Sequence, residues 1–461
     1  MRTYLREWGL AGAVAAIVLI GLLIEGVAGE VAATERRPPS GDRFVERGVF
    51  CPPSLPNTKT FLTASTVGKE SVPVGIEPTR PEPIELDPRR LFVQELPDSG
   101  PADVTGFGSP VFAGVVLRTE KPQEGEAASR CSPRAASTWH FAAGASTLGA
   151  DERLLIYNPF PDEAVVRVAF LTSGAEIRKA SLDDVAVPAR SAAFVRVNRY
   201  VQLQRVLAAT VEAERGRVVA WKVLFDRPEK APRGTQMALG VSRSAPTWYF
   251  PEGQIGPGAD TRIVIANPNP DVEATVTVSV VTGEEIVQPP DLVEMPIPAL
   301  SARLIRLEST LARRQRELGG VSVVVQSTNG TGIIAERTVR YSDPVNGSTA
   351  EIGSPVAGER WFVPPGTLDP STDTVVVMNP GEGEVTLDLE ILRAGRAPLA
   401  PDDLQGRTLA SGDRLKIGVV EWTRGQTAAV LVDSSGPVVV ERFSYSSIRD
   451  DAGSVMGVPL L

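Results

Sequence analysis

The sequence is poor in the residues that most metal and hydrolytic sites use. It contains one histidine, His140, and two cysteines, Cys51 and Cys131, among 461 residues. These side chains are too few for the Cys and His ligand set of a structural zinc site. A Ser-His-Asp triad would depend on that single histidine, and no G-x-S-x-G elbow, P-loop or helix-opening G-x-G-x-x-G is present. We therefore predict a protein that is not an enzyme and that uses no cofactor and no metal.

Concentrated basic charge and long helices are also missing. The formal net charge is −9, and no basic stripe of the kind that neutralises phosphates occurs, which argues against nucleic acid as a partner. Only 5 methionines stand against 42 glycines and 39 prolines. Such a composition indicates many turns and few long helices, so we predict an all-β fold.

An apolar to weakly polar run extends from Trp8 to Ile24 without a charged residue. Arg2 and Arg6 precede it, and cations before a span favour a cytoplasmic N-terminus with the rest of the chain translocated. The run meets the lower length limit of a membrane-spanning helix and the upper limit of a signal-peptide core. We favour a retained anchor, with residues 1–29 forming a cytoplasmic stub and a transmembrane helix. The alternative is a cleaved signal peptide and a secreted protein.

Both cysteines follow this segment and therefore lie on the exported side. In an oxidising compartment a pair of cysteines is most simply a disulfide. A bond between Cys51 and Cys131 would close a loop long enough to contribute about 4 kcal/mol. The alternative is two free, buried thiols.

A motif recurs at three places in the chain. In each copy a Gly follows a Trp at the fifth position, an Asp follows the Gly at the seventh, and an Asn before Pro closes an apolar run. The motif residues are Trp139, Gly144, Asp151 and Asn158, then Trp248, Gly253, Asp260 and Asn267, and finally Trp361, Gly366, Asp373 and Asn379. The tryptophans are 109 and 113 residues apart. That period is a small domain, because solenoid turns and propeller blades repeat every 20 to 50 residues or so.

Each repeat is predicted to be an immunoglobulin-like or fibronectin-like β-sandwich. Alternating strands follow the Asn-Pro pair, as in residues 274–280, and turn signals recur about every 8 to 12 residues. We divide the exported chain into a linker at 30–44, an irregular disulfide-linked β region at 45–137, and repeats at 138–246, 247–359 and 360–461. The alternative for 45–137 is an eroded fourth copy, because residues 129–133 resemble the segment that precedes Trp248.

The repeated residues are interpreted as structural. A tryptophan could stack on sugars, but one per domain at a fixed offset from a Gly turn favours a place in the core. The aspartates lack the acidic neighbours that Ca²⁺ needs, so we expect each to accept backbone N–H groups at a turn, and the asparagines to do likewise.

Two Glu-Arg pairs occur late in the second and third repeats, at Glu336-Arg337 and Glu441-Arg442. Neighbours on a strand point to opposite faces, so the members of one pair cannot contact each other. We favour charges that span a sheet edge or the interface between repeats over a catalytic carboxylate. The first repeat has Trp221-Lys222 at this place.

These motifs, together with Phe50-Cys51-Pro52-Pro53, resemble an uncharacterised family of exported, single-pass envelope proteins of high-GC Gram-positive bacteria. The resemblance covers most of the chain past Val49 and implies a location and a β-sandwich architecture, not an activity. We therefore expect a non-enzymatic, membrane-anchored binding or scaffolding protein whose partner is an envelope protein or a glycan. The alternatives are a carbohydrate-binding or adhesion protein and an extracytoplasmic hydrolase.

Overall fold

The computed structural model describes residues 47–77, 80–97, 101–120, 125–227, 233–282, 285–311, 319–343 and 346–460. The predicted membrane helix at 1–29 and the linker at 30–44 lie outside these residues. In the part that is described, no helix has both the length and the apolar character needed to cross a bilayer. The described strands pair antiparallel in a series of small sheets, which confirms the prediction of an all-β fold.

The first of four two-sheet modules spans residues 47–130. Its sheets have the strand orders β1-β6-β3-β4 and β5-β2-β7-β8. Val72, Val74 and Ile76 of β3 are buried, while the residues between them are half-exposed, which is the pattern of a sheet with one face on a core. The strands are β1 (Arg47–Cys51), β2 (Thr58–Thr66), β3 (Val72–Glu77), β4 (Arg80–Leu86), β5 (Phe92–Glu95), β6 (Ala102–Gly106), β7 (Val111–Thr119) and β8 (Gly125–Arg130).

The second module has sheets β14-β10-β16-β17 and β12-β11-β15-β9, with β13 also paired to β11. Its elements are β9 (Thr138–Phe141), β10 (Ala150–Asn158), β11 (Ala164–Leu171), β12 (Glu176–Arg178), η1 (Ala180–Leu182), β13 (Val185–Val187), β14 (Ser191–Arg196), η2 (Val197–Arg199), β15 (Ala208–Arg215), β16 (Val219–Asp226) and β17 (Gly234–Leu239).

The third module repeats this order in sheets β23-β19-β25-β26 and β18-β24-β20-β21, with β22 paired to β20. Its elements are β18 (Thr247–Phe250), β19 (Ala259–Asn267), β20 (Ala274–Val281), β21 (Ile286–Val287), η3 (Pro290–Leu292), β22 (Met295–Ile297), β23 (Ser301–Arg306), α2 (Leu307–Thr310), β24 (Ser322–Ser327), β25 (Ile334–Tyr341) and β26 (Gly347–Ile352).

In the fourth module one long strand, β32, belongs to both sheets. Its first part pairs with β27 and β29, and its second part pairs with β28 and β33. The elements are β27 (Gly358–Val363), β28 (Thr372–Met378), β29 (Val385–Arg393), η4 (Asp402–Leu404), β30 (Arg407–Leu409), β31 (Arg414–Gly418), α3 (Val420–Thr423), β32 (Ala428–Ser446), β33 (Asp451–Met456) and β34 (Val458–Pro459).

The first module shares its strand register with the other three. Val49 of β1 lies opposite Val104 of β6, as Trp139 of β9 lies opposite Val211 of β15. Phe50 follows Val49 and forms an isolated β-bridge with Ser132, just past the last strand of the first module. The residues that follow Trp139 and Trp248 form the same bridge just past the last strands of their own modules. Residues 47–131 therefore have the architecture of a fourth copy, in which valine takes the place of the repeat tryptophan.

Cys51 and Cys131 form a disulfide, as predicted. The register places Cys51 where the second module has Phe141, and Cys131 where it has Gly240. In that module the phenyl ring covers the glycine so closely that a Cβ on Gly240 would be 2.8 Å from Phe141 Cζ. Phe250 and Gly353 repeat this contact in the third module, at 2.7 Å. The disulfide thus replaces an aromatic ring packed on glycine.

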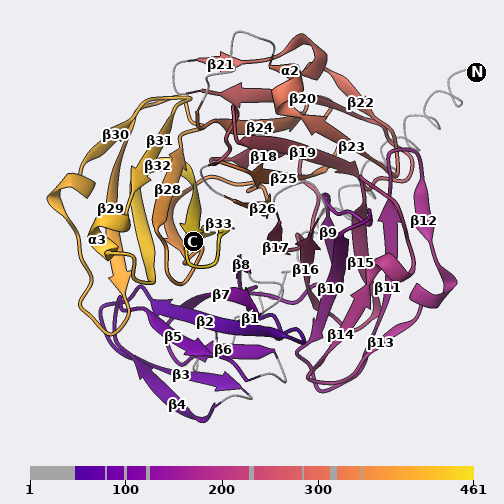
Figure 1. The fold of residues 1–461 in the computed structure, drawn as a ribbon. Helices are drawn as coiled ribbons and strands as arrows, with labels where there is room; N and C mark the ends of the chain where they lie inside the picture. The colour runs from indigo at the N-terminus through magenta and orange to yellow at the C-terminus, as the bar shows by residue number, and fades with distance from the viewer. Residues whose placement is uncertain are drawn as a thin grey trace, which may run out of the picture. The chain divides into compact units, whose positions relative to one another are not determined.

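One sheet of each module ends in strand β8, β17, β26 or β33, and this strand faces the other modules (Figure 1). Within the unit formed by residues 46–461, β8 contacts β17, β17 contacts β26, β26 contacts β33, and β33 contacts β8, so the contacts close into a circuit. Every residue of these four inner strands is buried except Arg130, which is half-buried. Strands buried on both faces need neighbours on both sides, so each module depends on the next.

Replacing both cysteines with serine should lower the free energy of unfolding by about 4 kcal/mol, because the disulfide closes a loop with a sequence separation of 80. The double variant Cys51→Phe/Cys131→Gly should recover part of this loss, since it supplies the pair that the next two modules use. Urea denaturation of the three proteins measures the difference. Equal destabilisation of the two variants would contradict the equivalence of these positions.

Candidate functional site

The three repeat tryptophans are buried within their modules. Trp139, Trp248 and Trp361 are 3%, 0% and 0% exposed. Each indole Nε1 donates a hydrogen bond to a backbone carbonyl at 2.7 to 2.9 Å. An indole without an exposed face cannot stack on a sugar, so these residues pack the core and do not form binding platforms.

The repeat glycines lie where a side chain has no room. A Cβ built on Gly144, Gly253 or Gly366 would be 2.6, 3.2 or 3.1 Å from a backbone carbonyl oxygen of a neighbouring segment. A close backbone approach of this kind is what glycine permits. Their recurrence therefore reflects packing.

The repeat asparagines fasten the turns that follow them. Asn158, Asn267 and Asn379 are buried, and each side-chain oxygen accepts the backbone N–H two residues later at 3.0 or 3.1 Å. Each side-chain amide donates to one carbonyl in the same turn and to another 29 or 30 residues further on. These contacts are the turn chemistry expected of asparagine before proline.

The repeat aspartates differ from the expectation that each accepts backbone N–H groups at a turn. All three are the second residue of a strand, and their partners are arginine side chains. The carboxylates of Asp151 and Asp260 are 26% and 28% exposed, whereas Asp373 is buried, pairs with Arg442 and accepts the Ser444 hydroxyl at 2.9 Å.

This difference arises from a shift of one residue. Asp373 is six residues before its asparagine, while Asp151 and Asp260 are seven before theirs. On a strand one residue changes the face, so Asp373 occupies the inward position of Glu152 and Thr261. The regular spacing from the glycine concealed two different structural positions.

Two buried ion pairs join neighbouring modules. Lys222 of the second module pairs with Glu336 of the third, and Arg337 of the third pairs with Glu441 of the fourth through both terminal nitrogens, at 2.6 and 2.9 Å. All four side chains are 0% exposed. Glu336 and Arg337, adjacent on β25, thus contact different modules from opposite faces of one strand.

These pairs follow one rule, in which the cation of a module meets the carboxylate of the next. The carboxylate also accepts backbone N–H groups of the earlier module, at 2.7 and 3.0 Å for Glu336 and at 3.1 Å for Glu441. By strand register, the cations Lys222, Arg337 and Arg442 occupy one equivalent position in their modules. The carboxylates Glu336 and Glu441 occupy a second equivalent position, one residue earlier.

At the junction of the first and second modules the carboxylate position holds Trp221, and at the junction of the fourth and first modules it holds Gly114. Trp221 is fully buried, and a Cβ on Gly114 would be 2.7 Å from Pro364 Cβ of the fourth module. Arg442 therefore has no carboxylate at the equivalent position of the first module and pairs with Asp373 of its own module. Packing therefore replaces charge at this buried position, while the less buried pair Arg89–Glu390 still joins the first and fourth modules at 3.0 Å.

Asp451, the first residue of β33, contacts all four modules. Its Oδ2 accepts the backbone N–H groups of Glu126 at 3.2 Å and Thr235 at 3.0 Å, and its Oδ1 accepts that of Ala452 at 2.9 Å. The backbone N–H of Ser348 also donates to this carboxylate. These four donors are the second residues of the four inner strands.

Other interior groups have shifted proton affinities. Burial raises the pKa of Glu152 to about 7 and that of Glu351 to about 8, with Lys222 and Arg130 opposing the respective rises. Burial also lowers the pKa of His140 to about 4, so the imidazole is neutral at pH 7. In the described part of the chain, no group of three or more His, Cys, Asp or Glu residues is placed to hold a metal ion.

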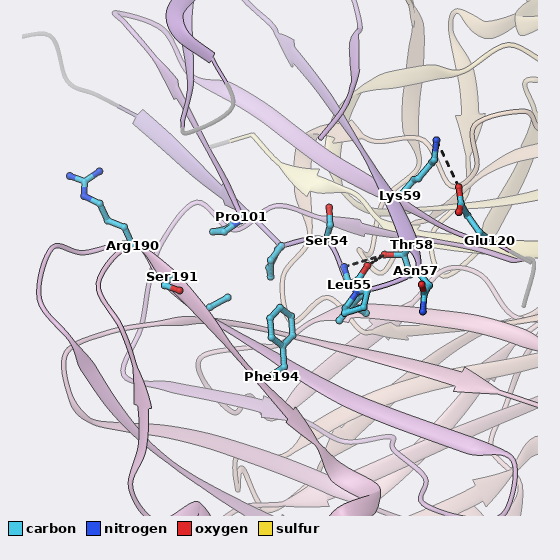
Figure 2. A pocket seen from close by; sticks show the side chains of 13 residues that line it. Ser54, Leu55, Asn57, Thr58, Lys59, Pro101, Glu120, Arg190, Ser191 and Phe194 are labelled. Carbon is cyan, nitrogen blue, oxygen red and sulfur yellow. Dashed lines mark hydrogen bonds and ion pairs between the residues drawn. The ribbon is translucent and has the colours of Figure 1, made fainter. Parts of the chain in front are cut away.

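The accessible feature of most interest is a groove of about 630 Å³ between the first two modules (Figure 2). Figure 2 shows the Phe194 ring pointing towards the loop that carries Leu55, and Phe194 is 48% exposed. Lys59 at one end pairs with Glu120 at 3.8 Å. The lining residues are Pro53, Ser54, Leu55, Pro56, Asn57, Thr58, Lys59, Pro101, Glu120, Arg190, Ser191, Ala192 and Phe194.

The groove lies where a backbone contact between modules is absent. Ala302 N of the third module donates to Thr172 O of the second at 2.8 Å, and Leu91 N of the first donates to Arg393 O of the fourth at 3.2 Å. Ala192 of edge strand β14 is the equivalent residue, and among the described residues its N–H has no such acceptor. The equivalent Arg414 of the fourth module donates its N–H to Asp413 Oδ1 instead. The groove therefore borders an open strand edge.

Two polar contacts link these two modules beside the groove. Tyr157 of β10 donates from its hydroxyl to Asp103 Oδ1 of β6 at 2.8 Å. Glu77 lies directly opposite Asp103 in the β3–β6 pairing. Its Oε2 forms an ion pair with Arg190 Nη1 of the second module at 3.6 Å. Burial raises the pKa of Asp103 to about 6, with the Tyr157 hydrogen bond opposing the rise and Glu77 adding to it.

Sequence reasoning did not find the groove, Asp103 or Asp451. The groove is built from a loop and a strand more than 100 residues apart, and nothing local marks it. Asp451 carries a signal that only an alignment of the four inner strands reveals, because the equivalent residues are Gly125, Gly234 and Gly347.

Comparison with known proteins extends the description only modestly. The Family of unknown function (DUF5719) matches residues 110–309, which is less than half of the chain. This match fits the expected likeness to an uncharacterised family. No curated protein matches the chain.

Solved structures are similar only at low scores. A Thermotoga maritima protein described as 1070 is 14% identical, with 23% of this chain and 96% of that chain covered and a TM-score of 0.19. The Anabaena sensory rhodopsin transducer is 17% identical, with 19% and 95% covered and a TM-score of 0.17. The Streptomyces avermitilis alpha-L-rhamnosidase, solved with L-rhamnose, is 9% identical, with 84% and 52% covered and a TM-score of 0.14. Scores this low support no inference about this chain.

Lys222→Met should lower the free energy of unfolding by about 3 to 5 kcal/mol, because it leaves Glu336 buried without its cation. The double variant Lys222→Met/Glu336→Gln should regain at least half of that loss, since glutamine keeps an oxygen for the backbone donors but carries no charge. Denaturant titration measures both values. A double variant less stable than Lys222→Met would contradict the assignment of that loss to the unpaired charge of Glu336.

Asp103→Asn should stabilise the protein at pH 7.5 and leave it unchanged near pH 4. The folded-state pKa of Asp103 is raised to about 6, so its contribution to stability is present below the unfolded value and is lost as the pH rises through 6. Asparagine does not ionise, so the free energy of unfolding of the variant should exceed that of the native protein by about 1 to 3 kcal/mol at pH 7.5. Its side-chain oxygen still accepts the Tyr157 hydroxyl. Thermal unfolding from pH 4 to 8 measures the difference, and a constant difference across that range would contradict the assignment.

Proposed function

We propose that this protein is a non-enzymatic binding or scaffolding protein of the bacterial cell envelope. In this proposal residues 1–29 anchor it in the membrane, the modules are immunoglobulin-like or fibronectin-like sandwiches outside the cytoplasm, and secretion after cleavage is the alternative. The apolar run before residue 25 and the Cys51–Cys131 disulfide support export. The partner would be an envelope protein or a glycan.

The observation that carries the proposal is the groove at the first junction, with its exposed phenyl ring and open strand edge. Phe194 is among the large apolar side chains that remain exposed, at 48%, and aromatic anchors of this kind are frequent at interaction sites. The strongly perturbed interior groups, such as Glu152 and Glu351, are only 0% and 2% exposed. Binding at the surface is therefore better supported than chemistry in the interior.

A photo-reactive phenylalanine analogue at position 194 should crosslink a defined envelope component in cells. The same analogue at Leu148, which is 88% exposed in the same module, serves as the matched control. Phe194→Ala should reduce recovery of the crosslinked component in affinity capture at least fivefold, with Leu148→Ala retaining it. Identical crosslink patterns at both positions would contradict the proposal.

A carbohydrate-binding role has one remaining observation in its favour. Trp422 of α3 is half-buried and lines a surface pocket of about 350 Å³. The charged residues that line the same pocket are Asp403, Arg407, Lys416 and Glu421. Aromatic rings with hydrogen-bonding neighbours suit sugars. Binding of purified cell-wall glycans that is lost in Trp422→Ala and kept in Phe194→Ala would favour this second function over the first.

A further inference from the structure

The Asp451 carboxylate lies at the place where all four modules meet. The backbone N–H groups that it accepts belong to Glu126, Thr235, Ser348 and Ala452, one from each inner strand. Because these residues occupy the same position in their strands, the donors are related by the repeat and not by chance proximity. Burial raises the pKa of Asp451 well above its usual range, and these four backbone hydrogen bonds oppose the rise because they favour the ionised carboxylate.

Only one side chain fits at this point. The first residue of the inner strand is glycine in three modules, and a Cβ on Gly125 would be 2.6 Å from Asp451 Oδ2. A Cβ on Gly347 would be 2.6 Å from Ala452 N, one of the donors. Three glycines therefore leave the space that one aspartate fills.

We infer that the four inner strands build a site for one small carboxylate, which the chain occupies with its own Asp451. The site belongs to the junction of the four modules and not to β33. It follows that the carboxylate can be supplied from another inner strand, or from solution as a free anion, when Asp451 is absent.

The alternative is that Asp451 only fastens the start of its own strand. Its contact with Ala452 N, the next residue, would serve that purpose. However, the donors Glu126 and Thr235 precede it by 325 and 216 residues and lie in other modules. A local role does not account for these contacts.

Formate tests the site in the variant Asp451→Gly. Formate supplies both oxygens of the aspartate carboxylate, and without Cβ it needs only a small shift away from Cα to reach a non-bonded distance. Acetate would place its methyl group at the Cβ position, too close to Cα, and formamide lacks the charge. Glycine is the native residue at this position in three modules, so the variant is compatible with the local backbone.

We expect Asp451→Gly to unfold at a lower temperature than the native protein and to regain several degrees in saturable sodium formate. Sodium acetate at the same concentration and formamide should give less than a third of that shift, and neither the native protein nor Asp451→Ala, whose Cβ blocks the gap, should respond to formate. Equal shifts with formate and acetate, or no response in a cooperatively folded Asp451→Gly, would overturn the inference.

Relocating the carboxylate provides an independent test. In Gly125→Asp/Asp451→Gly the carboxylate comes from β8, and the collision of its Cβ with Asp451 Oδ2, at 2.6 Å, is removed. The approach to Thr235 Oγ1, at 2.7 Å, remains and requires that hydroxyl to rotate away. The double variant should melt at a higher temperature than either single variant, because Gly125→Asp alone places two carboxylates at one site. A double variant at or below the less stable single variant would show that the site is specific to β33.

Discussion

The architecture depends on the convergence of four backbone N–H groups on one carboxylate. An inner strand buried on both faces has no water to satisfy its first donors, and an unsatisfied buried N–H costs about 1 to 3 kcal/mol. Asp451 satisfies donors from all four modules with two oxygen atoms. The circuit of contacts among β8, β17, β26 and β33 therefore has a chemical reason to include every module.

Around this shared centre the four junctions are held by different forces. Charge operates where the register places a cation against the next module's carboxylate, as in Lys222–Glu336 and Arg337–Glu441. Packing operates where that position holds Trp221 or Gly114. Buried pairs of this kind contribute little net stability compared with apolar packing, but they oppose any neighbour that leaves a charge unpaired. In a chain of similar modules, such pairs favour one order of neighbours over others.

The sequence predicted the fold class and the disulfide, and the reasons are local. Glycine and proline frequencies and period-two alternation carry their meaning within a few residues, and the disulfide followed from the presence of only two cysteines, both after the apolar run. The first module was harder because its core position holds Val49 instead of tryptophan, so the motif is absent although the register is kept. Asp373 shows the converse error, since a constant spacing from Gly366 hid a shift to the opposite face of the strand. The groove and the Asp451 site were beyond reach, because both are assembled from modules that only the tertiary structure brings together.

The first junction departs from the other three in several ways at once, and these departures coincide with the groove. It has Trp221 where an ion pair would stand, no described backbone bond at Ala192, and a Tyr157–Asp103 hydrogen bond in their place. The junction of the third and fourth modules also lacks the backbone bond, at Arg414, but it has the buried Arg337–Glu441 pair. Charge, backbone bonds or tight packing close the other three junctions. An exposed phenyl ring at the first junction therefore has no structural need behind it. The loss of a junction contact exposes a strand edge, and an edge strand is the element to which another chain can add without disturbing the core. The asymmetry of the junctions, more than any single residue, is therefore what supports the proposal of a partner at this groove.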